Sequence, residues 1–133
     1  MRSFLLMLAF FTRLPVPHIP YTDERYIRGI PLLPLVGAVT GAFLYCASLI
    51  RPYLPLPLSG VLLFLLYLLL TGGLHLDGLA DSCDALYSGR DRETMLEIMK
   101  DSRSGSFGVL GLITAAAFYL ALLPDASPAV LFF

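Results

Sequence analysis

The chain has 133 residues, a formal net charge of −1 and two cysteines. Apolar residues make up 57 % of it and charged residues only 14 %, whereas a soluble chain typically carries about 25 % charged residues. This composition excludes an ordinary soluble domain and predicts a single membrane domain of all-α fold class, a polytopic helical bundle over residues 1–133. The net charge argues against a nucleic-acid partner, and no disulfide is expected between Cys46 and Cys83.

The first apolar run covers Phe4–Phe11 and is too short to cross about 30 Å of hydrocarbon. Residues 13–17 follow it, in place of the small-residue cleavage site of a signal peptide. We therefore predict a short interfacial or re-entrant helix over residues 1–12, which ends before Pro15 and Pro17.

A polar connector over residues 18–29 leads to the first predicted span, residues 30–50, which is close to the roughly 20 residues that a crossing requires. Gly37 and Gly41 form a small-xxx-small step on this span. Such a step predicts the close approach of another helix and permits pairing with a second copy of the chain.

The second predicted span begins at residue 58 and reaches full length only if it continues to residue 76. It then passes through Gly72 and Gly73, which permit the helix to bend or open. The acidic motif that follows is expected at the end of this helix, at the level of the lipid headgroups.

Three carboxylates follow in the motif His75–Asp84. On a helix, Asp81 lies about 40° from Asp77 in one direction and Asp84 about 20° in the other, so the three acids share one narrow face. Like charges on one stripe repel, and oxygen ligands suit Mg²⁺ or Mn²⁺ better than zinc. The stripe therefore predicts a divalent-cation site, and the alternative is a solvated acidic face.

His75 lies about 160° from Asp77 on an unbroken helix, nearly opposite the acids. Three interpretations stay open. The Gly-Gly step reshapes the first turn and brings His75 to the metal, His75 works from a neighbouring surface, or it only caps or packs.

The most polar segment, residues 85–105, contains a predicted amphipathic helix over residues 91–101. Residues 100–108 combine two cations with serines and glycines, a composition that can wrap a phosphate but that also fits a flexible loop. The third predicted span covers residues 107–123, and a fourth is expected to begin at 129–133 and to be cut short.

Lysine and arginine residues set the expected orientation. Eight of the nine lie on one side of the predicted spans, and one lies in the opposite loop. The eight are Arg2, Arg13, Arg25, Arg28, Arg90, Arg92, Lys100 and Arg103, and the one is Arg51. The amino terminus and the acidic motif are therefore predicted to face the cytoplasm from a multi-pass inner membrane protein.

Acids on a membrane helix, nearby arginines and an oxygen-only metal site together indicate a phosphorylated cytosolic substrate. Mg²⁺ that bridges a diphosphate can neutralise charge on a leaving group, and in phosphoryl transfer the protein mainly positions the reactants. The residues thus favour a membrane phosphotransferase that splits a nucleotide diphosphate and passes the phospho-group to an alcohol.

Several segments resemble the cobalamin synthase family, the adenosylcobinamide-GDP ribazoletransferases. These segments are residues 12–15, 34–37, 75–84 and 95–103, with Gly105 and Gly108. The resemblance extends over nearly the whole chain and corresponds to the amino-terminal half, since family members are considerably longer.

This resemblance implies the final assembly step of adenosylcobalamin. A hydroxyl of α-ribazole, or of its 5′-phosphate, attacks the phosphate attached to adenosylcobinamide, and GMP leaves from adenosylcobinamide-GDP. Mg²⁺ is the implied cofactor. The assigned residues are the metal ligands Asp77, Asp81 and Asp84, the catalytic residues Asp77, Asp81 and His75, and the phosphate contacts Arg13, Lys100 and Arg103.

Three other functions are compatible with parts of this pattern. A CDP-alcohol phosphotransferase would share the chemistry, but its motif has an arginine shortly after Asp-Gly that is absent here. A cation- or proton-coupled transporter would place its acids near the middle of the bilayer, whereas these acids are expected at the end of a span beside a polar loop. A membrane scaffold would leave the acidic stripe without a purpose.

Overall fold

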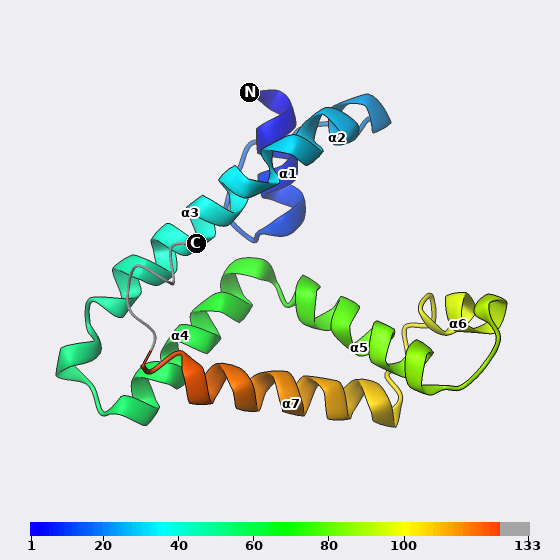
Figure 1. Cartoon of the computed structure of the whole chain (residues 1–133). Coiled ribbons are helices and arrows are strands. Elements are labelled where there is room, and N and C mark those ends of the chain that lie inside the picture. Colours follow the sequence, from blue (N-terminus) through cyan, green and yellow to red (C-terminus); the bar gives the residue numbers. More distant parts are fainter. Residues whose placement is uncertain (126–133) are drawn as a thin grey trace.

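The computed structural model describes residues 1–125, and these residues are helical apart from turns and connecting segments, with no strand among them (Figure 1). The predicted fourth span at 129–133 lies outside the described residues. In chain order the elements are α1 (Arg2–Phe11), α2 (Asp23–Gly29), the 3₁₀ turn η1 (Ile30–Leu32), α3 (Leu33–Ser48), the 3₁₀ turn η2 (Arg51–Tyr53), α4 (Leu56–Thr71), α5 (Leu74–Tyr87), α6 (Arg92–Ile98) and α7 (Ser106–Leu122). The all-helical prediction is confirmed for this part of the chain.

The amino-terminal helix α1 packs against α2 and α3. Leu6, Met7 and Leu8 are buried there together with Val36 of α3. Gly29 at the end of α2 is needed for this contact, because a β-carbon at that position would lie 2.6 Å from Cγ of Met7. The predicted short helix at residues 1–12 is therefore present, and its apolar face is used for packing within the chain.

One continuous helical stretch, Asp23–Tyr53, is long and apolar enough to cross a membrane: it has 31 residues, and an 18-residue window within it has a mean hydropathy of 1.9. It contains the predicted span at 30–50. The pair α4 and α5 would count as a second such element only if its bend lies within one span, and α7 is apolar but only 17 residues long. The described residues thus contain one helix, or at most two, of membrane-spanning length.

The helix predicted to continue from residue 58 to residue 76 instead stops at Thr71, and α5 leaves at an angle of 89°. Gly72 and Gly73 both adopt left-handed backbone conformations, with φ of 64° and 76°. Glycine is the residue that adopts this conformation without steric cost, so the Gly-Gly step ends one helix and starts the next.

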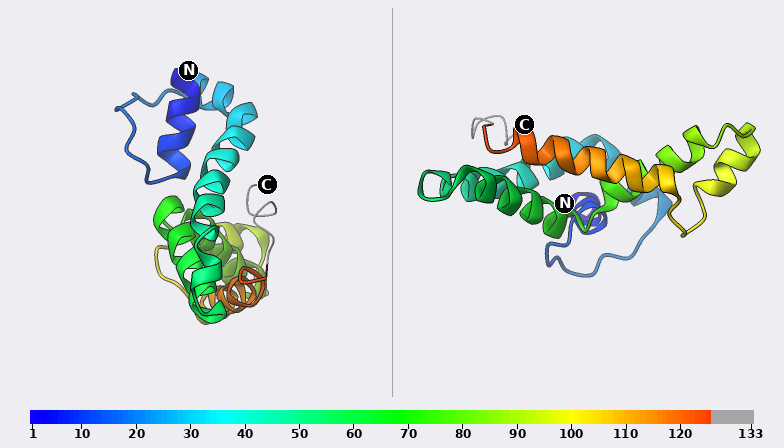
Figure 2. Two further views of the ribbon diagram at one scale, coloured as in Figure 1. Left: turned by 90° about the vertical axis from the view of Figure 1, so that its left-hand side faces the viewer. Right: turned by 90° about the horizontal axis from the view of Figure 1, so that it is seen from below.

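Helices α5 and α7 run side by side (Figures 1 and 2). Their contact is built from small residues: a β-carbon on Gly111 would lie 2.6 Å from Sγ of Cys83, and one on Gly108 would lie 3.0 Å from the carbonyl oxygen of Ala80. By contrast, a β-carbon on Gly37 would meet nothing within 4 Å. Close helix packing of the kind that the sequence suggested at Gly37 and Gly41 is thus found at Gly108 and Gly111, and Gly41 itself is buried.

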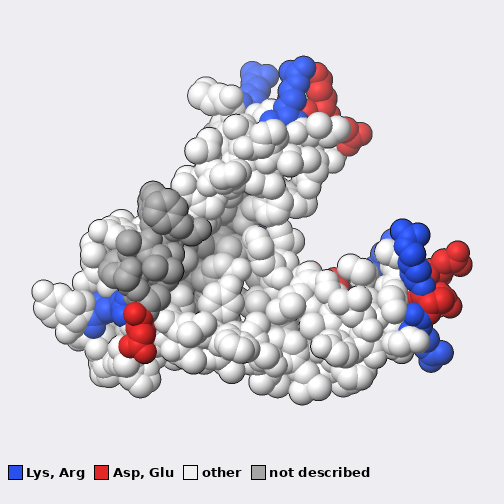
Figure 3. All heavy atoms as spheres, in the orientation of Figure 1, with Lys and Arg blue, Asp and Glu red and all other residues white. Residues whose placement is uncertain are grey.

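Charged side chains gather at the tips of the molecule (Figure 3). One group lies over α2, another around α6, and a smaller one where α4 and α7 meet, while the surface between them on the face shown is almost free of charge. The amphipathic helix predicted at 91–101 is present as the shorter α6, and Asp91 caps it by accepting the amide of Thr94 at 2.9 Å.

Candidate functional site

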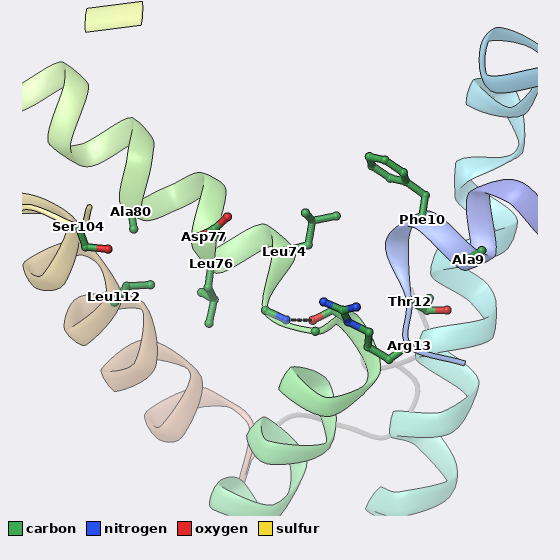
Figure 4. Close-up of a pocket in the computed structure, with 13 residues that line it drawn as sticks. Ala9, Phe10, Thr12, Arg13, Leu74, Leu76, Asp77, Ala80, Ser104 and Leu112 are labelled. Carbon is green, nitrogen blue, oxygen red and sulfur yellow. Dashed lines mark hydrogen bonds between the residues drawn. The ribbon is translucent and has the colours of Figure 1, made fainter. Parts of the chain in front are cut away.

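The bend between α4 and α5 forms one wall of a cavity of about 590 Å³ (Figure 4). The end of α1 and the residues after it form a second wall, the first two turns of α5 a third, and the loop before α7 contributes Ser104. The polar and charged side chains in the lining come from Thr12, Arg13, Thr71, Asp77 and Ser104. Segments that are far apart in the sequence therefore meet around this space.

Arg13 is held at the cavity by its backbone. Its amide donates to the carbonyl oxygen of Leu70 at 2.7 Å, which ties the segment after α1 to the last turn of α4. The preceding residue, Thr12, is buried and donates its hydroxyl to the carbonyl of Leu8 at 2.6 Å. The Arg13 guanidinium lies directly on Gly72, where a β-carbon would collide with it. Gly72 thus supplies both the turn and the room for the cation.

Asp77 lies on the α5 wall, and its side chain is exposed. The cavity therefore offers a guanidinium, a carboxylate and a hydroxyl to one ligand. A guanidinium forms paired hydrogen bonds with phosphate oxygens, and a carboxylate can hold a hard cation that bridges the same phosphates. This combination suits a phosphorylated ligand.

The structure does not bring the three motif acids together as one metal site. Asp77, Asp81 and Asp84 are all on α5 and share its stripe, but a helix rises about 1.5 Å per residue, so Asp77 and Asp84 are about 10 Å apart along the axis. Asp81 is half-buried and does not line the cavity that Asp77 lines. Within residues 1–125 no group of three His, Cys, Asp or Glu side chains is placed to hold a metal ion.

Asp84 is instead bound to the amino end of α7. Its Oδ2 accepts the amide of Gly105 at 2.6 Å, and its Oδ1 accepts the amide of Gly108 at 2.8 Å. Gly105 is the N-cap residue of α7 and Gly108 lies in its first turn, where backbone donors lack a partner within the helix. Sequence reasoning missed this contact, because capping residues are sought immediately before a helix and Asp84 lies on the preceding long helix.

His75 faces a different cavity, of about 220 Å³, on the other side of the bend. Its ring lies 6.2 Å from the ring of Phe11, and the remaining wall is formed mainly by apolar residues of α3 and by Tyr67. Thr71 borders both cavities. His75 therefore lies apart from the cavity that Asp77 lines, and its contact with Phe11 is a packing contact.

Lys100 and Arg103 do not line either cavity. Arg103 pairs with Asp101 at 2.7 Å, in an exposed loop. The hydrogen bond from Arg103 lowers the pKa of the Asp101 carboxyl, and the same hydrogen bond raises the pKa of the guanidinium. From this loop it is Ser104 that reaches the larger cavity, and the signal for it in the sequence was the serine–glycine composition rather than the cations.

Comparison with known proteins matches residues 3–133 to the cobalamin-5-phosphate synthase family. A relative from Alkaliphilus oremlandii, named adenosylcobinamide-GDP ribazoletransferase, is 48 % identical over 114 residues, which are 85 % of this chain and 47 % of the relative. Relatives of the same name from Acetivibrio thermocellus and Listeria monocytogenes are 44 % and 43 % identical, over 92 % and 94 % of this chain and 50 % and 52 % of their own length.

The chain therefore spans about half the length of the curated relatives it matches. No solved structure matches it. The family resemblance that the acidic motif suggested is confirmed by these matches, and the family match covers the bend, both cavities and the loop before α7. Because the match runs from residue 3 to residue 133, the chain belongs to the cobalamin-5-phosphate synthase family.

Proposed function

We propose that this chain forms the diphosphate-binding part of an adenosylcobinamide-GDP ribazoletransferase, the activity for which its relatives are named. The observation that supports this most directly is the cavity at the α4–α5 bend, where Arg13 and Asp77 come from segments far apart in the sequence. In this reaction, a hydroxyl oxygen of α-ribazole or of its 5′-phosphate forms a bond to the phosphorus attached to adenosylcobinamide. The bond from that phosphorus to GMP breaks, and the hydroxyl loses its proton.

In this proposal Arg13 binds the diphosphate oxygens. Its backbone is fixed to α4 by the hydrogen bond to Leu70, and its guanidinium lies against Gly72 at the cavity. Preorganised charge of this kind is the main contribution that a protein makes to phosphoryl transfer. Ser104 is close enough to the same space to donate a further hydrogen bond.

Mg²⁺ is the cofactor that we propose for this site. The three motif acids do not form a cage for it, but enzymes usually hold Mg²⁺ with one or two carboxylates plus phosphate oxygens of the substrate. We propose Asp77, which lines the cavity, as one such ligand, and Asp81, one turn further along α5 and outside the cavity lining, as the second. When bound, the ion would neutralise charge that develops on the leaving GMP.

For the acceptor we propose the smaller cavity, where His75 lies. Imidazole is the side chain that most often takes a proton from an attacking hydroxyl. The two cavities share Thr71, so an acceptor in one would lie next to a diphosphate in the other. Lys100 and Arg103 lie outside both cavities, and in this proposal they contribute only positive electrostatic potential along the path by which the substrate approaches.

We also propose that the protein is a multi-pass protein of the inner (cytoplasmic) membrane with this site on the cytoplasmic side. Large apolar side chains are exposed along three helices, among them Leu35, Leu69 and Ile113, and such a surface suits lipid better than water. The charged tips agree with this arrangement (Figure 3).

The test is an assay of the purified full-length protein for GMP release from adenosylcobinamide-GDP plus α-ribazole. We expect release that requires Mg²⁺, stops with EDTA and is lost in Asp77→Asn. A CDP-alcohol in place of adenosylcobinamide-GDP is the control substrate and should give no transfer. Absence of GMP release at every metal concentration, or faster turnover of the CDP-alcohol, would contradict the proposed function.

A further inference from the structure

The contact between Asp84 and α7 joins two helices at the edge of the larger cavity. Both carboxylate oxygens accept backbone amides, from Gly105 and Gly108, at 2.6 and 2.8 Å. These residues are separated from Asp84 by 21 and 24 positions in the sequence. A negative charge at a helix amino end is favourable because the helix dipole is positive there, so the contact combines two hydrogen bonds with a favourable charge.

The two glycines are shaped to receive this carboxylate. A β-carbon on Gly105 or on Gly108 would collide with an Asp84 oxygen. The Tyr87 and Phe107 rings also stack at this junction, with centroids 5.5 Å apart. The amino end of α7 is therefore fixed to α5 by backbone, carboxylate and aromatic contacts at one place.

Ser104 is the residue immediately before this anchor, and it is the residue of the loop that lines the larger cavity. Its neighbours in the loop are exposed, and Arg103 bonds through its amide and its guanidinium to Asp101 of the same loop. The position of Ser104 at the cavity thus depends on the hydrogen bonds that Asp84 makes to the next residue and to the first turn of α7.

We propose that Asp84 is a positioning residue of the enzyme: it fixes the start of α7 and thereby holds Ser104 at the diphosphate cavity, and it does not ligate the metal ion. The part of this proposal that concerns substrate rests on the function proposed above. The anchoring of α7 by Asp84 can be measured without any substrate. An experiment can therefore contradict the anchoring without contradicting the proposed function, or the reverse.

The first experiment follows loop anchoring by limited trypsin cleavage of the full-length protein in detergent, with EDTA present. Trypsin cuts after Arg103, directly before Ser104. We expect Asp84→Ala to speed this cleavage by about fivefold or more, since loss of the anchor favours local opening. Asp84→Asn keeps one good acceptor oxygen and should give an intermediate rate.

The matched control is Asp91→Asn. Asp91 is also a carboxylate that caps a helix, through the amide of Thr94, but it lies at α6 and away from the cavity. It should leave cleavage after Arg103 unchanged. An Asp84→Ala rate equal to wild type in EDTA would overturn the anchoring role, and Asp84→Asn supplies the same test if the alanine variant does not fold.

The second experiment separates positioning from metal binding by kinetics. For Asp84→Asn we expect the KM for adenosylcobinamide-GDP to rise by about tenfold, the effect of one lost charged hydrogen bond, with a smaller change in kcat. The Mg²⁺ concentration that gives half-maximal activity should stay at the wild-type value. A large increase in that concentration, with unchanged trypsin cleavage, would instead show that Asp84 is a metal ligand.

Discussion

The two ends of α5 present the same kind of side chain to very different surroundings. At the amino end, Asp77 is exposed and borders the larger cavity. Near the carboxyl end, Asp84 accepts two amides at the amino end of α7, and Ala80, one turn earlier, is buried with its carbonyl oxygen against Gly108. Asp77 and Asp84 lie on the same face of the helix, but only the Asp77 carboxylate is exposed at the cavity, where a ligand can bind.

The difference has its origin in the elements that flank α5. The left-handed glycines turn α4 away by 89°, which leaves the first turns of α5 open toward Arg13. The remainder of the helix is covered by α7, which approaches closely through Gly108 and Gly111. The role of an acid on this stripe is therefore decided by what packs beside it and not by its position around the helix.

The largest expected effect is that of Asp77→Asn, which should lower kcat for GMP release by about 10²–10³-fold, as loss of a preorganised charged group typically does. Asp84→Asn should keep far more of its kcat.

Asp81→Asn sharpens the comparison, because Asp81 lies between the other two acids. If Asp81 holds the metal ion, this substitution should abolish turnover while membrane insertion stays intact. Steady-state GMP release measures all three, and near-normal turnover of Asp77→Asn would remove the distinction.

A second test concerns packing at the closed end of α5. Gly108→Ala places a β-carbon against Ala80 and Asp84, and overpacking of this kind typically costs about 1–3 kcal/mol. Gly78→Ala, on the open part of the same helix, meets nothing within 4 Å and should stabilise the helix by roughly 0.5–1 kcal/mol. Unfolding in detergent, followed by circular dichroism, compares the two. Equal stability of both variants would argue against a tight α5–α7 contact.

A third test separates the turn from the cation at the open end. Gly72→Ala and Gly73→Ala both force a left-handed conformation on alanine, at about 1–2 kcal/mol each. Only the Gly72 variant also collides with the Arg13 guanidinium. Both should lower the free energy of unfolding by a similar amount, and Gly72→Ala should in addition raise the KM for adenosylcobinamide-GDP. An equal KM in the two variants would show that Arg13 does not bind the substrate.

The smallest effects are expected in the loop that contains Arg103. Arg103→Gln should change turnover little, because Arg103 lies outside both cavities. It should raise the pKa of Asp101, which the Arg103 hydrogen bond now holds below its ordinary value. The ion pair stabilises the loop above the ordinary carboxyl pKa and loses this contribution as the pH falls through the lowered one. Carboxyl ¹³C shifts measure the change, and an unaltered Asp101 titration would contradict the pairing.

Several elements of the fold could be predicted from the sequence because their signals are local. The apolar runs gave α1, most of α3 and α7 to within a few residues, and the charge pattern gave α6. For Gly72 and Gly73 the sequence predicted only that the helix could bend there, and not that it would end. Two successive left-handed residues depend on contacts with segments distant in the sequence, such as the hydrogen bond from the Arg13 amide to Leu70. A local sequence pattern carries no information about such contacts.

The candidate site was predictable in part. The angular argument placed the three acids on one face correctly, but it left out the rise along the helix, which separates Asp77 from Asp84. It also had no means of finding the amides of α7 that Asp84 accepts. Arg13 was chosen for its charge and does line the cavity, whereas Lys100 and Arg103 were chosen for the same reason and do not.

The hydrogen bond from the Arg13 amide to Leu70 bears on the biogenesis of the protein. While the nascent chain leaves the ribosome, α1 is made first, but its partner at the end of α4 follows only after α2 and α3 have been synthesised. Single helices can form one at a time during translation. The contact between Arg13 and the end of α4 can form only after α4 has been made. The pocket is therefore completed by a late folding step, in which the amino-terminal segment docks onto helices that were translated after it.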